Sequence, residues 1–87
     1  MSSIQANPDS LKKLKSDIDR SQREINQAIA RIRSSLKAAE WRDSVKDQFE
    51  RDLEQVLRSV AAFDNNADQL KRYLDKKVQI LQNYQGR

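Results

Sequence analysis

Three acidic residues, Asp47, Glu50 and Glu54, are spaced by three and four positions, so they share one face of any helix that contains them. Carboxylates in such a cluster could pair for general acid–base chemistry or bind a cation. Lys46 and Arg51 are close neighbours in sequence, however, and surface ion pairs explain the spacing more simply. We therefore interpret these carboxylates as part of a solvated helix face.

The residue types that most enzymes need are missing from this chain. It has no His and no Cys, which removes the commonest general base and the thiolate ligands of metal sites. A single Gly leaves no room for a Gly-rich phosphate loop, and no nucleophile stands beside a base. The sequence predicts a protein without enzymatic activity, cofactor or metal, which acts by binding other molecules.

Basic residues gather in two segments that lie away from the middle of the chain. Such a cluster could meet nucleic acid, an anionic membrane surface or an acidic partner. Interspersed acids such as Asp17, Asp19 and Asp68, a net charge of only +4 and the lack of an aromatic stacking platform favour a solvated face instead. Nucleic acid is therefore the less favoured partner. The cluster comprises Lys12, Lys13, Lys15, Lys71, Arg72, Lys76 and Lys77.

Long helices must position these side chains. The 87 residues include one Gly, one Pro and 34% charged residues, so the chain has few of the turn-forming residues that a sheet needs between its strands. Asn7 and Pro8 predict a helix start, with Asn7 as N-cap and Pro8 at the first helical position. Asp43 and Ser44 can each cap a second helix. We expect an all-α antiparallel helical hairpin: one domain, residues 1–87, with helices over about 8–39 and 44–85 and a turn at about 40–43.

Apolar residues recur at alternating intervals of three and four along both expected helices, which is typical of a coiled-coil seam. Ser21, Ser35 and Lys77 interrupt this seam and are expected to help fix the register. The residues expected to face inward are Leu11, Leu14, Ile18, Ile25, Ala28, Ile32 and Ala39 on the first helix, and Phe49, Leu53, Val56, Val60, Phe63, Ala67, Leu70, Leu74, Leu81 and Tyr84 on the second.

Further apolar residues flank the two seams, and they exceed what one hairpin can cover. We expect a second hairpin to bury them in a four-helix-bundle dimer, homomeric or heteromeric. The expected dimer interface comprises Ile29, Leu36, Leu57 and Tyr73.

The second helix, about 62 Å long, should overhang the first, which is about 48 Å long. The residues expected to lack cover there, and so to form a partner-docking segment, are Val78, Leu81 and Tyr84. The longest apolar stretch, residues 60–63, is far shorter than the ~20 residues that span a membrane, so no membrane span is predicted.

The turn sequence Trp41-Arg42-Asp43, followed by Val45 and Phe49, resembles the Trp-x-Gly turn of the WXG, or ESAT-like, family of small type VII secretion proteins. Chain length, helix layout and a polar start at residues 4–8 are also similar to that family. Asp43 stands where the family usually has Gly. Because Asp tolerates left-handed backbone and caps helices well, we expect the hairpin to survive this change.

The resemblance implies a small secreted substrate, or a targeting partner for a larger effector, of a type VII-like secretion system. A secretion ATPase or the effector would then be the partner, and Trp41 is either a plug between diverging helices or half of a composite surface that the ATPase recognises. Many family members carry a Tyr-x-x-x-Asp/Glu export signal, whereas Tyr73 is followed here by Lys77. Recognition therefore uses another form of signal, or the protein is a partner that is not itself exported.

Residues 1–10 contain neither a basic leader nor an apolar run, so we expect secretion without a cleavable signal peptide, or a cytoplasmic location before export. The alternative function is a cytoplasmic coiled-coil adaptor or a nucleic-acid-binding hairpin that uses the basic cluster.

Overall fold

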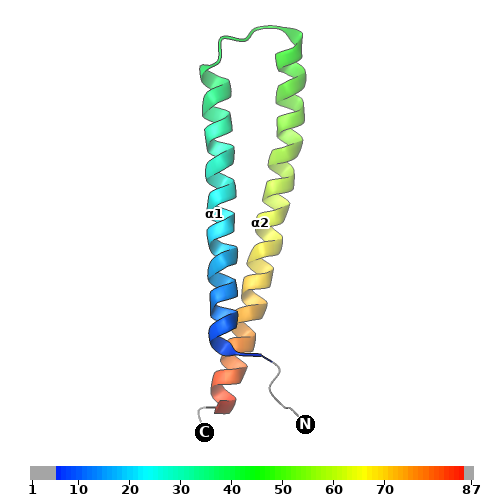
Figure 1. Cartoon of the computed structure of the whole chain (residues 1–87). Coiled ribbons are helices and arrows are strands. Elements are labelled where there is room, and N and C mark those ends of the chain that lie inside the picture. Colours follow the sequence, from blue (N-terminus) through cyan, green and yellow to red (C-terminus); the bar gives the residue numbers. More distant parts are fainter. Residues whose placement is uncertain (1–5, 86–87) are drawn as a thin grey trace.

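The computed structural model describes residues 6–85, which form two long helices joined by a short turn. Helix α1 spans Pro8–Ala38 and helix α2 spans Ser44–Gln85, and the two run antiparallel side by side (Figure 1). The described residues contain no strand. The molecule is a rod of 66 × 18 × 17 Å. The expected all-α helical hairpin is confirmed.

Helix α1 begins at the cap that the sequence predicts. The Asn7 side chain accepts hydrogen bonds from the backbone N–H groups of Asp9, at 2.8 Å, and Ser10, at 3.3 Å, and Pro8 takes the first helical position. This satisfies two of the donors that a helix start leaves unpaired. Ile4 and Gln5, part of the polar start noted in the sequence, lie outside the described residues.

Helix α2 is capped by Asp43, so the structure decides between the two residues that could do it. Asp43 Oδ1 accepts from the N–H groups of Val45, at 3.0 Å, and Lys46, at 3.1 Å, while Ser44 is the first helical residue. No described residue has a positive φ. The turn therefore does not use the left-handed conformation that Gly would permit, and Asp at position 43 fits without strain.

Cross-helix polar contacts fix the register of the hairpin. Lys15 lies opposite Asp75, with Nζ 2.7 Å from Oδ1, and Lys71 Nζ lies 3.1 Å from Asp19 Oδ1. One turn further along α1, Gln22 Nε2 donates to Asp68 Oδ1 at 3.1 Å. These contacts place the start of α1 beside the second half of α2, so α2 extends past α1 at its C-terminal end, as Figure 1 shows.

On α2 the expected seam is correct at one of the two positions in each heptad and wrong at the other. On α1 the same holds for the first three heptads, whereas in the last one both Ile32 and Ser35 are exposed. Leu11, Leu53 and Leu74 are half-buried as expected, and Ala67 is buried. Leu14, Val56 and Leu70, however, are exposed. The cause is the width of the apolar stripe: it covers three heptad positions on each helix, and contact with one other helix buries only two of them. The remaining expected inward residues that are exposed are Ile25, Ile32, Ala39, Phe49, Phe63 and Tyr84.

Candidate functional site

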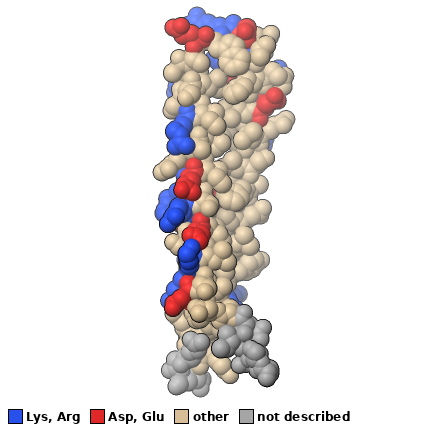
Figure 2. All heavy atoms as spheres, viewed as in Figure 1, with Lys and Arg blue, Asp and Glu red and all other residues tan. Residues whose placement is uncertain are grey.

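One side of the hairpin carries large apolar side chains that the described part of the chain covers only in part. We call it the apolar face and define it by Leu14, Ile25 and Ile32 on α1 and by Phe49, Val56, Phe63 and Leu70 on α2; these side chains are 36–50% exposed. The α2 members recur every seven residues, so they form one line along the helix. Figure 2 shows a side of the molecule whose charged groups lie mainly along the α1 edge and at the turn. The surface beside the α1 edge is largely uncharged.

The rows from the two helices lie on the same side of the hairpin. Leu14 follows the inner residue Leu11 by three positions, as Val56 follows Leu53, and equal offsets fall on the same side of an antiparallel helix pair. A groove near the turn supports this placement independently, because Ile32 and Phe49 both line it. The apolar face is therefore continuous across both helices.

Trp41 lies at the turn end of this face, and two contacts orient its side chain. Its indole Nε1–H donates to Asp43 Oδ1 at 2.8 Å, and its ring packs against Phe49 with a centroid distance of 5.6 Å and an angle of 56° between the rings. The ring is half-buried and lines a groove of about 610 Å³. Trp41 thus forms a wall of an open groove. The other lining residues are Ala28, Arg31, Ile32, Ser35, Leu36 and Ala39.

The opposite side of the hairpin carries a polar network that joins the helices. Gln22, only 8% exposed, donates through Nε2 to Asp64 Oδ1 at 3.3 Å as well as to Asp68. Asn26 Nδ2 donates to Asp64 Oδ2 at 3.0 Å. Sequence reasoning missed this network, although one signal was present: polar residues occupy inner heptad positions at Gln22, Asp64 and Lys71.

Electrostatics within this network favour the charged forms of its members. The hydrogen bond from Lys71 lowers the pKa of Asp19, and Arg23 adds to this effect. The hydrogen bond from Gln22 lowers the pKa of Asp68, and the pKa of Lys71 is raised chiefly by Asp19. A donor beside a carboxylate stabilises its ionised form, and a carboxylate does the same for the ammonium group.

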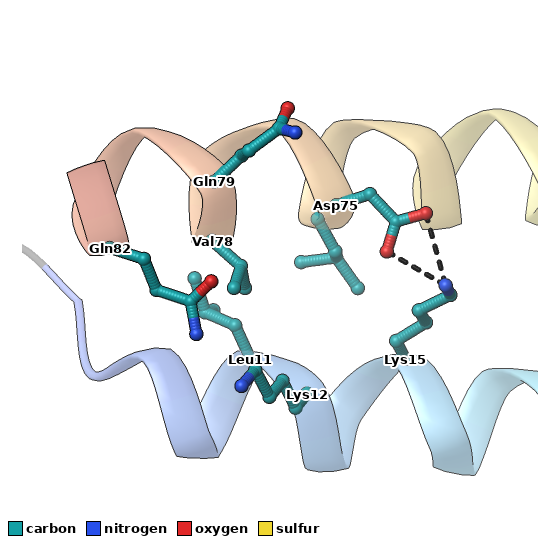
Figure 3. Close-up of a pocket in the computed structure, with 8 residues that line it drawn as sticks. Leu11, Lys12, Lys15, Asp75, Val78, Gln79 and Gln82 are labelled. Carbon is teal, nitrogen blue, oxygen red and sulfur yellow. Dashed lines mark hydrogen bonds and ion pairs between the residues drawn. The ribbon is translucent and has the colours of Figure 1, made fainter.

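The basic cluster is partly neutralised by this arrangement. Figure 3 shows Lys15 directed at the Asp75 carboxylate, with its Nζ 2.7 Å from Oδ1 and 3.0 Å from Oδ2. Lys71 is likewise engaged by Asp19 and Asp68. With Lys13 paired to Asp17 at 2.8 Å, three of the seven basic side chains already have acidic partners within the chain, which weakens the case for a polyanion site. The hollow of about 370 Å³ beside them is also lined by Leu11, Lys12, Leu74, Val78, Gln79 and Gln82.

The expected interface residues divide into two groups. Ile29, Leu36 and Leu57 are half-buried, and Leu36 and Leu57 line a common groove from the two helices of the same hairpin. Tyr73 is exposed, and its hydroxyl accepts from Gln69 Nε2 at 3.0 Å. The exposed rows of the apolar face lie further outward than these half-buried residues. We therefore infer that the apolar face, rather than the four expected residues, is the interface.

The expected docking segment is shorter than its sequence suggested. Val78, expected to lack cover, is only 9% exposed, because the register brings it against Leu11 at a shared hollow with Leu74. Leu81 is half-buried, whereas Tyr84 is 80% exposed. The uncovered overhang therefore begins after Val78 and presents chiefly Ile80 and Tyr84, which line a shallow hollow with Leu81 and Asn83.

The carboxylates near the start of α2 lie on the surface among basic and amide side chains. Within residues 6–85 no group of three or more acidic side chains is placed to hold a metal ion. Arg51 donates to Gln48 Oε1 at 3.0 Å, and Glu50 and Glu54 border a surface groove with Lys46. Neither described helix is apolar over a long enough stretch to cross a membrane.

Comparison with protein-family models, curated proteins and solved structures finds no match to this chain. The class that the fold and the site define is thus a helical hairpin with one uncovered apolar face and an aromatic turn.

Proposed function

We propose that this protein acts by protein–protein binding, and that its apolar face packs on a second helical hairpin to form a four-helix-bundle dimer. The observation that carries the proposal is the continuous apolar face, whose seven large side chains stay 36–50% exposed in the single chain. Contiguous apolar surface of this kind marks interaction sites in soluble proteins. Four-helix bundles bury such stripes at their centre.

The dimensions of the face suit a specific interface. The side of the hairpin that carries the face measures 66 Å by 18 Å, which leaves room for the ~800 Å² that each partner contributes to a standard interface. The face itself runs over about 32 Å of this length, from Phe49 to Leu70. Charged groups lie chiefly at its edges, with Asp17, Glu24 and Arg31 spaced by seven along α1. A desolvated centre with a charged rim is the usual anatomy of an interface. The partner hairpin is a second copy or a related chain.

We further propose that the dimer is a WXG-like substrate, or a targeting partner for a larger effector, of a type VII-like secretion system. Support comes from the resemblance at Trp41-Arg42-Asp43 and from the position of this motif at the turn between two helices of the expected lengths. Trp41, held against Phe49, would form one part of a surface read by a secretion ATPase. The exposed overhang at Ile80 and Tyr84 would supply another part.

Two measurements test this proposal on the whole chain. Light scattering coupled to gel filtration should give twice the chain mass of 10.2 kDa at tens of micromolar, because the apolar face drives association by mass action. Capture of a type VII-like secretion ATPase or effector by the tagged dimer tests the second part. A well-folded monomer that captures neither component contradicts both parts, whereas a poorly folded monomer indicates a heteromeric partner.

A further inference from the structure

The two halves of the hairpin differ in the contacts that hold α1 and α2 together. We define the locked half as residues 11–26 with residues 64–78, and the turn half as residues 27–38 with residues 44–63. Every cross-helix hydrogen bond or ion pair found among the described residues lies in the locked half, from Lys15–Asp75 to Asn26–Asp64. Between the helices of the turn half, the described residues make no hydrogen bond or ion pair.

Burial follows the same division. The three side chains classed as buried, Gln22, Ala67 and Val78, all belong to the locked half. In the turn half, the inner residues Leu36 and Leu57 are only half-buried. The turn half has grooves of about 610 Å³ and about 340 Å³, and the locked half has hollows of about 370 Å³ and about 320 Å³, so the largest of these four lies in the turn half. Packing between the helices is therefore loosest where polar contacts are absent.

We propose that the hairpin opens from its turn end as a jaw, and that the polar layer formed by Gln22, Asn26 and Asp64 marks where the opening stops. Separating the turn half exposes side chains that are already half in solvent and breaks no polar contact between helices. Separating the locked half would strip Lys71 and Gln22 of their carboxylate partners. Segments with few buried apolar contacts open at lower free energy than well-packed ones.

The consequence is that, when the jaw opens, the inner residues Ile29, Leu36 and Leu57 extend the apolar face around each helix. This inference concerns one hairpin and does not depend on the proposed secretion function. It predicts that the turn half samples a wider range of interhelix distances than the locked half.

Paired spin labels on the full chain test this directly, since the absence of native Cys permits clean labelling. One variant carries Ser34→Cys with Gln55→Cys in the turn half, and the control carries Arg20→Cys with Gln69→Cys in the locked half. All four side chains are exposed, and both pairs occupy matching heptad positions. Each labelled protein is diluted with unlabelled chain to remove distances between copies. The turn-half pair should show a broader distribution with a longer-distance component, and equal widths would overturn the proposal.

Amide hydrogen exchange on the unlabelled chain gives a second readout. Amides at 29–36 and 53–60 should exchange at least roughly tenfold faster than those at 15–22 and 67–74. Asp64→Ala removes the acceptor of the polar layer, so fast exchange should spread into residues 18–26, whereas Asp64→Asn should hold the boundary more closely. Uniform exchange along both helices contradicts the jaw. A boundary unmoved by Asp64→Ala contradicts the role given to the polar layer.

Discussion

Asp43 Oδ1 accepts the indole N–H of Trp41 at 2.8 Å and, with the same oxygen, caps helix α2 through the N–H groups of Val45 and Lys46. One carboxylate thus starts a helix and orients the aromatic side chain of the turn. Gly, the residue at this position in the Trp-x-Gly turn that this segment resembles, has no side chain to form this tether. Trp41 is thereby held against Phe49 at the end of the apolar face.

Replacing Asp43 separates these two roles. Asp43→Ala should lower the free energy of unfolding by about 1 kcal/mol through loss of the N-cap. Asp43→Gly should cost only a few tenths of a kcal/mol as a cap, but it also removes the Trp41 tether. Thermal melts report the cap, and fluorescence of the single Trp reports the tether. Asp43→Asn is the control, because its side-chain oxygen can still accept; unchanged fluorescence in Asp43→Gly would show that the tether does not orient the ring.

Stability should fall in acid because the network carboxylates are favoured in their ionised form. The folded-state pKa values of Asp19 and Asp68 lie below their usual 3.8. The two carboxylates therefore add to the free energy of unfolding above pH 3.8, and this contribution is lost as the pH falls from 3.8 to the lowered pKa values. The pKa of Lys71 is raised above 10.5, so its contribution is present below 10.5 and is lost as pH rises through the raised pKa. Urea unfolding at a series of pH values measures both.

The double variant Asp19→Asn with Asp68→Asn is the matched comparison for this pH dependence. It should lose less stability than the wild type between neutral pH and pH values below 3.8, because it lacks two of the carboxyl groups whose pKa is lowered in the folded chain. Parallel curves for the two proteins would show that other carboxylates cause the acid effect.

Ala67 marks a close contact between the helices, since it is only 2% exposed. Ala67→Leu should lower the free energy of unfolding by about 1–3 kcal/mol, because the added methylene groups force the helices apart. Ala62→Leu places the same side chain at an exposed position of α2 and should have little effect. Denaturant melts of both variants test this, and equal stabilities would mean that the locked half is less tightly packed than described.

The overhang should contribute to recognition without contributing to the hairpin. Ile80→Asp with Tyr84→Asp places charges on its two most exposed apolar side chains and should weaken capture of a secretion ATPase or effector, with the helical signal kept. Gln79→Asp with Gln82→Asp adds the same charge at neighbouring exposed positions that do not line the hollow with Ile80 and Tyr84, and is the control. Equal capture by both variants would remove the overhang from the proposed recognition surface, and loss of the dimer would assign it to the bundle.

The helices and their caps followed from local chemistry, whereas the side chains facing inward did not. Asn7 and Pro8 define the α1 start because capping involves only neighbouring residues. The choice between Leu14 and Lys15 as an inner position depends on how the partner helix lies, and an apolar stripe three positions wide permits either. Val78 was misplaced for the same reason, because the register rests on polar contacts such as Lys15–Asp75 that hydrophobic periodicity does not report.

The most direct test of the apolar face is the oligomeric state of two variants that differ by one position. Phe63→Asp puts a charge at the centre of the face, whereas Ala62→Asp puts the same charge on the adjacent exposed position outside it. Sedimentation equilibrium should show the wild type and Ala62→Asp as dimers and Phe63→Asp as a helical monomer, because burying an unpaired charge in the interface is costly. A wild-type dimer that persists unchanged in Phe63→Asp would contradict the account.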